Sequence, residues 1–183
     1  MKHFLAVLFG LVATLGAAAQ GLAPDALVKG VTNDVLEIVR KDKDIQAGNT
    51  RKAVELAEAK VLPHFDFAHM TRLAVGKAWR QASPAQQQAL TDEFRTLLVR
   101  TYSKALTEYR NQTIDFKPVK MQPADTDVVV RTLVQQPGSK PVEIDYSLDK
   151  TDQGWKVYDI AVAAVSLVTN YRSSFAQEIS AGG

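Results

Sequence analysis

The sequence contains no cysteine, and this absence excludes disulfide bonds, thiolate metal ligands and cysteine nucleophiles. An excess of charge of one sign is also missing, because 22 Lys and Arg residues are balanced by 20 Asp and Glu residues and the two signs are interleaved. Such a chain offers no basic stripe for a phosphate backbone, so we expect no nucleic-acid partner. Beyond the N-terminus, no apolar run approaches the roughly 20 residues of a membrane-spanning helix.

The N-terminus has the three parts of an export signal. Lys2 supplies a positive charge, an apolar stretch runs from Phe4 to Leu15, and small residues at 17–19 form a cleavage site. The apolar stretch is too short for a membrane anchor. We therefore predict a signal peptide over residues 1–19; removing these 19 residues from 183 leaves a mature chain of 164, residues 20–183, which is long enough for one domain with its own core.

The first half of the mature chain has the period of amphipathic helices. Apolar residues recur at spacings of three or four within residues 24–41, and a second helix is expected over residues 49–62. Ser83 and Pro84 begin a third helix as an N-cap and a proline at the first helical position. Its apolar stripe continues to Tyr109 and is wide enough to cover a sheet or a ligand.

After residue 112 the apolar period changes to two, which is typical of strands. Turn residues separate the runs, so the strands are joined as antiparallel hairpins. We predict strands at 113–121, 127–135, 142–149 and 155–160, followed by a closing helix at 166–179. The fold class is α+β: a helical N-terminal half packed on one face of a four-stranded antiparallel twisted sheet, with a closing C-terminal helix and an apolar pocket between.

The stretch LPHFDFAH, residues 62–69, places two histidines and a carboxylate close together. On one helix His64 and His69 would lie about 140° apart, so they cannot share a metal ion. Pro63 instead predicts that a helix begins at Asp66, whose carboxylate caps the free amides of the first turn. We therefore expect a helix start here, with no metal site and no cofactor.

Motifs for phosphate binding and nucleophilic catalysis are missing. Gly76-Lys77 would belong to a phosphate loop only with a glycine at the position of Thr71, and no GxGxxG or GxSxG motif occurs. Asp159 remains as a carboxylate near the end of the last strand. It is either a buried group with a raised pKa that could act in catalysis or the acceptor of a structural hydrogen bond, and the second reading is favoured.

Residues 161–168 lead from the last strand into the closing helix and carry mostly small apolar side chains. By composition this segment is typical of a core. Its small side chains could also leave space between the sheet and the helices, where a cavity would favour an apolar ligand.

Several blocks of the mature chain occur in the order and spacing of a known family. They are Leu62-Pro63 with Phe65-Asp66-Phe67, the run at 75–82, Glu93-Phe94 through Thr101-Tyr102, the run at 154–159 and the run at 165–172. Together with the export signal, these blocks resemble the MlaC family, the periplasmic phospholipid carriers of Gram-negative bacteria that are also described as toluene-tolerance auxiliary proteins. The resemblance covers residues 25–180. Ala164 departs from it, because the family commonly has glycine there and a turn with positive φ would strain alanine.

The resemblance implies an α+β fold with a deep apolar pocket that holds the acyl chains of a phospholipid and leaves the headgroup outside. It also implies a periplasmic location and two docking partners: an outer-membrane lipoprotein–porin complex, and an inner-membrane MCE-domain protein of an ABC transporter. Such a carrier maintains the lipid asymmetry of the outer membrane and is not an enzyme. We expect it to work as a monomer.

The apolar periodicity predicts the residues that line the lipid-binding pocket. They are Phe94, Leu98, Tyr102 and Leu106 from the long helix, Ile144, Tyr146, Trp155 and Val157 from the sheet, and Val165, Leu167 and Val168 from the closing segment. Two alternatives stay open. One is an α+β pocket enzyme that acts on a small apolar substrate through Asp159 or a tyrosine, and the other is a structural protein whose apolar side chains fill the same space.

Overall fold

The computed structural model describes residues 21–182, so the predicted signal peptide at 1–19 lies outside the described residues. The helices are α1 (Pro24–Lys41), α2 (Lys43–Gln46), α3 (Thr50–Lys60), α4 (Phe67–Val75), α5 (Pro84–Tyr102), α6 (Lys104–Glu108) and α7 (Arg172–Ser180). The strands are β1 (Thr113–Phe116), β2 (Asp127–Gln135), β3 (Val142–Thr151), β4 (Gly154–Val162) and β5 (Val165–Ser166). The predicted α+β class is confirmed. Within the described range, no helix combines the length and the apolar character needed to cross a bilayer.

The helix starts follow the capping residues in the sequence. Ser83 and Gln86 form a reciprocal capping box at the start of α5, and Pro84 occupies its first turn. Asn49 accepts a hydrogen bond from the amide of Lys52 at the start of α3. The predicted long helix is interrupted, however, because α5 ends at Tyr102 and α6 begins again at Lys104.

The sheet is an antiparallel meander in the order β1-β2-β3-β4-β5. Four strands were predicted, and the fifth is the two-residue β5, which pairs with β4 through Val162 and Val165. The closing helix therefore begins later than predicted, at Arg172, because residues 165–171 form β5 and a 3-10 turn. In this turn the Ser166 hydroxyl accepts hydrogen bonds from the amides of Val168 and Thr169.

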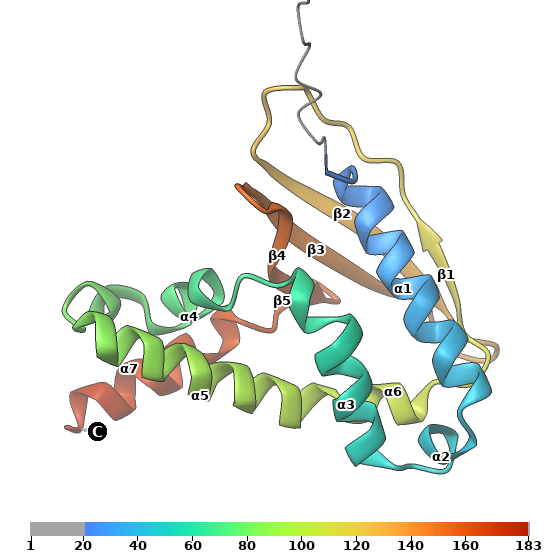
Figure 1. Ribbon diagram of the computed structural model, residues 1–183, viewed down its shortest axis with the longest axis horizontal. Coiled ribbons are helices and arrows are strands. Elements are labelled where there is room, and N and C mark those ends of the chain that lie inside the picture. Colours follow the sequence, from blue (N-terminus) through green and yellow to red (C-terminus); the bar gives the residue numbers. More distant parts are fainter. Residues whose placement is uncertain (1–20, 183) are drawn as a thin grey trace, which may run out of the picture.

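The interior is divided into three apolar clusters. Figure 1 shows why: α1 lies along the sheet, whereas α4, α5 and α7 extend away from the strands, and α3 stands between these two parts. The sheet cluster contains Val28, Val128, Val130, Leu148, Trp155 and Val157. The α1–α3 cluster contains Val35, Val39, Ile45, Leu56 and Tyr109, and the α4–α5 cluster contains Met70, Ala74, Phe94, Leu98 and Val168. Unfilled space is therefore expected where the three clusters meet.

The β4–β5 turn contains the strained backbone that the sequence suggested. Ala163 and Ala164 have φ values of 49° and 65°. A two-residue hairpin turn with positive φ at both central positions is a type I′ turn, which favours glycine and asparagine. An alanine held in this region costs about 1–2 kcal/mol, so the departure from glycine at Ala164 carries a local cost.

Replacing Ala164 with glycine is therefore expected to stabilise the protein. Relief of about 1–2 kcal/mol of strain is offset in part by the roughly 0.5–1 kcal/mol that glycine loses through greater freedom of the unfolded chain, which leaves a net gain of up to about 1.5 kcal/mol. Urea denaturation of the mature protein measures this change. Ala89→Gly, the same substitution at an exposed position inside α5, should destabilise by about 0.5–1 kcal/mol. Equal effects of the two substitutions would show that the turn is not strained.

Candidate functional site

A partly open apolar cavity of about 170 Å³ lies between the helices and β4. Each of the three clusters contributes to its wall: Leu106 packs against the α1–α3 cluster, Leu98 belongs to the α4–α5 cluster, and Ile160 packs against the sheet cluster. The complete lining is Ala57, Val61, Leu62, Phe65, Phe67, Met70, Leu98, Val99, Tyr102, Ser103, Leu106, Ile160 and Leu167. The cavity is thus the space that remains where separate cores approach one another without merging.

The side chains around the cavity are held by local features of the sequence. Leu98, Val99 and Tyr102 share one face of α5, as residues three or four positions apart do on a helix. Phe65 lies in an extended segment that pairs with Val157, and the next amide donates to the Val157 carbonyl at 2.9 Å. Two elements distant in sequence are therefore joined at the cavity wall.

The strand side of the cavity is fixed in a similar way. The amide of Leu167, just after β5, donates to the carbonyl of Ile160 on β4 at 2.8 Å. Both residues line the cavity. The tight β4–β5 turn therefore brings a residue of the closing segment back onto the wall formed by the sheet.

Polar groups on the wall are few. Among residues 21–182, Tyr102 and Ser103 at the α5–α6 junction are the only lining residues with polar side chains. Burial, followed by a hydrogen bond with Tyr171, raises the pKa of Tyr102 to about 12. The phenol therefore stays protonated at neutral pH, so it can donate a hydrogen bond but is a poor general base.

Asp159, the carboxylate considered for catalysis, does not line the cavity. Its Oδ1 accepts a hydrogen bond from the amide of Val168 at 3.3 Å. The structural hydrogen bond favoured by the sequence is therefore present, and the wall of the cavity offers no carboxylate for acid–base chemistry.

Four of the eleven predicted pocket residues line the cavity, namely Leu98, Tyr102, Leu106 and Leu167. The other seven lie elsewhere. Phe94 and Val168 are buried in the α4–α5 cluster, Trp155 and Val157 are buried in the sheet cluster, Tyr146 packs against the sheet cluster, Ile144 is half-buried on β3, and Val165 is 56% exposed. Periodicity identifies an apolar face, but it does not say whether that face meets a core or a cavity.

Nine lining residues were not predicted, and six of them come from α3, α4 and the segment between these helices. They are Ala57, Val61, Leu62, Phe65, Phe67, Met70, Val99, Ser103 and Ile160. In the LPHFDFAH stretch, the apolar residues Leu62, Phe65 and Phe67 face the cavity, and the two histidines do not line it. The sequence signal that could have identified them is a group of large apolar residues, Leu62, Phe65 and Phe67, at a helix boundary marked by proline.

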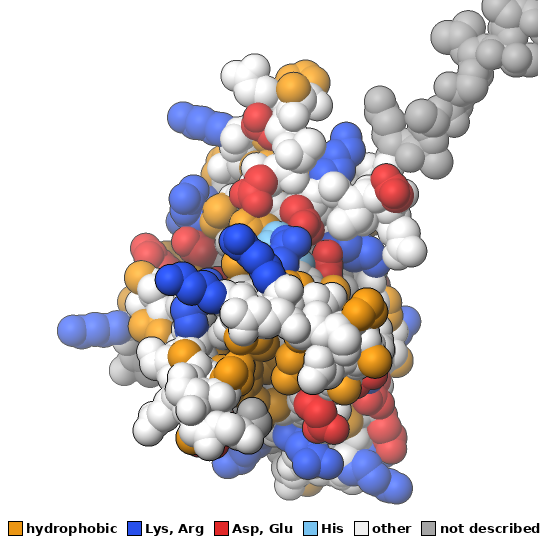
Figure 2. Space-filling view, turned by 90° about the vertical axis from the view of Figure 1, so that its left-hand side faces the viewer, with side chains coloured by type: hydrophobic (Ala, Val, Ile, Leu, Met, Phe, Trp, Pro, Cys, Tyr) orange, Lys and Arg blue, Asp and Glu red, His pale blue; other side chains and the backbone are white. Residues whose placement is uncertain are grey.

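A second concave surface has a different character. It is a groove of about 740 Å³ between the end of α4 and α7, and it is lined by Trp79 and other apolar residues together with four basic ones. The basic residues are Arg72, Lys77, Arg80 and Arg172, and no acidic residue lies in its lining. Figure 2 looks onto this end of the molecule and shows Lys and Arg side chains beside hydrophobic ones. The four basic side chains distinguish this groove from the cavity, whose lining contains no basic residue.

The family model of the MlaC protein matches residues 29–183. The chain belongs to the MlaC family. Among curated relatives, the toluene tolerance protein ttg2D of Pseudomonas putida is 25% identical over 184 residues, covering 100% of this chain and 84% of the relative. The intermembrane phospholipid transport system binding protein MlaC of Haemophilus influenzae is 26% identical over 111 residues, covering 59% of this chain and 52% of the relative.

A solved structure extends the similarity from the sequence to the fold of this chain. The phospholipid-binding protein from Ralstonia solanacearum, determined in complex with a phospholipid, is 42% identical in sequence. Its superposition has a TM-score of 0.81 and covers 88% of this chain and 90% of the other. The two chains therefore share both their sequence family and the arrangement of helices and strands that surrounds the cavity.

Proposed function

We propose that this MlaC family member is a periplasmic phospholipid carrier that shields the acyl chains of one lipid in the apolar cavity. The observation that carries the proposal is the cavity itself, whose lining contains hydrocarbon side chains and only two polar ones. The phospholipid held by the 42% identical Ralstonia protein of the same fold supports it.

The free energy of hydration explains why a carrier is needed. Two acyl chains of about 16 carbons carry roughly 30 methylenes, and exposing them to water at about 0.8 kcal/mol each costs roughly 24 kcal/mol. Unassisted release into water is therefore negligible. A bilayer and an apolar cavity both keep the chains dry, so exchange between them is nearly balanced and can be directed by partner contacts.

The cavity must widen to accept a lipid. Its volume of about 170 Å³ is below the range of roughly 300–1,000 Å³ that is usual for pockets of drug-sized ligands. Its walls come from separate clusters, and the break between α5 and α6 lies at Ser103 in the lining. We infer that the lipid separates these clusters, with α3 and α6 moving relative to α5.

Membership of the MlaC family supports the transport route that we propose for this carrier. The carrier receives or delivers lipid at an outer-membrane lipoprotein–porin complex and at an inner-membrane MCE-domain protein of an ABC transporter. This exchange maintains the lipid asymmetry of the outer membrane. In this proposal no bond is made or broken in the carrier.

The lipid content of the purified protein tests this function. The mature chain is purified without detergent and extracted with organic solvent. Mass spectrometry is expected to find about one phospholipid per chain, because exposing the acyl chains to water is too costly for the lipid to dissociate during purification. The carrier function would be refuted if the protein purified from cells contained no phospholipid and also took up none from vesicles.

A further inference from the structure

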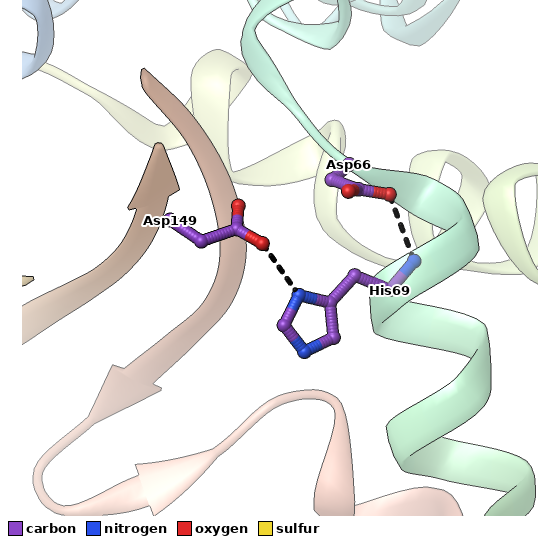
Figure 3. A group of neighbouring side chains, drawn as sticks. All are labelled: Asp66, His69 and Asp149. Atoms are coloured by element: carbon purple, nitrogen blue, oxygen red, sulfur yellow. Dashed lines mark hydrogen bonds and ion pairs between the residues drawn. The ribbon is translucent and has the colours of Figure 1, made fainter. Parts of the chain in front are cut away.

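Three side chains outside the cavity form a cluster of metal-ligand types. Asp66 and His69 come from the start of α4, and Asp149 comes from β3. One ligand atom of each lies within 4.8 Å of the others, and all three residues are half-buried. Figure 3 shows the Asp149 carboxylate and the His69 ring pointing toward one another from the strand and the helix, with Asp66 beside them. The cluster thus spans two elements that are 80 residues apart in sequence.

The cluster has more acceptors than donors. His69 Nδ1 lies 2.9 Å from Asp149 Oδ2, and Asp66 Oδ1 accepts from the His69 amide at 2.8 Å. The second oxygen of Asp149, Oδ1, is buried and has no hydrogen-bond partner in the described part of the chain. A buried acceptor left without a partner is costly, so the Asp149 carboxylate would be stabilised by a cation close to it.

Another carboxylate lies close to the cluster. Asp127 lies nearby, where its Oδ2 accepts from the hydroxyl of Tyr158, and the Tyr158 ring stacks on His69 with centroids 4.3 Å apart. Within residues 21–182, no Lys or Arg nitrogen lies within 4.0 Å of a carboxylate oxygen of Asp66, Asp127 or Asp149. Carboxylates therefore outnumber the positive charges in direct contact with them.

We propose that Asp66, His69 and Asp149 bind a divalent transition-metal ion of the zinc type. One imidazole nitrogen and two carboxylate oxygens, with water in the fourth position, is a ligand set that Zn²⁺ accepts, at about 2.0–2.2 Å from each atom. The ion lies between His69 Nδ1 and Asp149 Oδ2, and the neutral imidazole that binds it through Nδ1 carries its single proton on Nε2. Asp66 binds through the carboxylate oxygen that does not cap the helix.

Such an ion would join α4 to β3 beside the cavity. Phe65 and Phe67, the neighbours of Asp66, both line the cavity. A bound ion would therefore hold one part of the cavity wall against the sheet while other parts move. The site goes beyond the carrier function and does not depend on it. The competing account is a hydrogen bond between His69 and Asp149 that ties the two elements without a metal.

Calorimetric titration with ZnCl₂ distinguishes the two accounts. The tag-free mature chain, treated with chelator and dialysed, is expected to bind one Zn²⁺ per chain. His69→Gln and Asp149→Asn should each weaken binding about 100-fold or more, since changes even beyond the direct ligands cost about 10–100-fold. His64→Gln is the matched control, because this second histidine lies outside the cluster, and it should leave binding unchanged. Delipidated protein should give the same result, which separates this site from a lipid phosphate.

Asp66→Asn separates an effect on metal binding from an effect on folding. Asparagine is as good an N-cap as aspartate, so the helix start is retained while a charged ligand is lost. This variant should keep its thermal midpoint without metal and bind Zn²⁺ at least about tenfold more weakly. Absence of Zn²⁺ binding tighter than about 1 mM by wild-type protein would overturn the proposal. Equal losses in the His64 and His69 variants, or no loss in either aspartate variant, would also overturn it.

Discussion

Val99→Glu is expected to remove nearly all bound phospholipid from the purified protein. Val99 is half-buried on α5 and lines the cavity. A carboxylate at this position must either lose its hydration against the acyl chains or hold water in the cavity, and an unpaired buried charge costs several kcal/mol. Since each 1.4 kcal/mol is a factor of ten, we expect lipid affinity to fall about 100-fold or more.

Leu97→Glu is the matched control for this change. Leu97 is two positions away on the same helix, is 36% exposed and does not line the cavity. Both variants gain the same charge, so a general effect of charge on α5 would appear in both. Phospholipid per chain is measured by mass spectrometry, and circular dichroism with thermal melting confirms that each variant is folded. Equal lipid content in the two variants would show that the cavity is not the lipid site.

Trp155→Ala is expected to lower the free energy of unfolding by about 3–5 kcal/mol, the usual range for removing a buried large aromatic side chain. Trp155 is 7% exposed and packs in the sheet cluster with Val28 of α1 and Val157 of β4. The folded protein should still hold its lipid, because Trp155 does not contact the cavity. Urea denaturation and lipid content, measured on the same preparation, check the two parts of this expectation.

The other tryptophan provides a comparison for the stability measurement. Trp79 is half-buried at the basic groove, so Trp79→Ala should cost less than Trp155→Ala. A Trp155 variant that loses its lipid while remaining stable would place this residue in the lipid site, as the apolar period alone predicted. A similar loss of stability in both variants would contradict the assignment of Trp155 to the sheet core.

Local signals explain why the fold class could be predicted. The box formed by Ser83 and Gln86 and the cap formed by Asp66 act within four residues, so the sequence reveals them directly. Alternating apolar residues and turn chemistry likewise give the three longer hairpin strands. The two-residue β5 was missed because a strand of that length has no period, and its turn uses alanines where glycine would have marked it.

Long-range partners explain why the site could be predicted only in part. Leu98 and Trp155 are both large apolar residues on apolar faces, but Leu98 reaches the space between the clusters and Trp155 fills the sheet core. The pairing of His69 with Asp149 spans 80 positions and has no local pattern. Whether an apolar face lines a cavity or packs in a core depends on how the helices pack together. This packing is a property of the assembled fold.

The most direct test of the acyl-chain site is to map its contacts with a phospholipid that carries a photoreactive diazirine on one acyl chain. After loading from vesicles and irradiation, peptide mass spectrometry should place the cross-links on the cavity wall, at residues such as Val61, Val99 and Leu106. Cross-links confined to the sheet cluster under α1 or to the groove around Trp79 would contradict the account, because the lipid would then be held where this structure has a filled core or a basic surface.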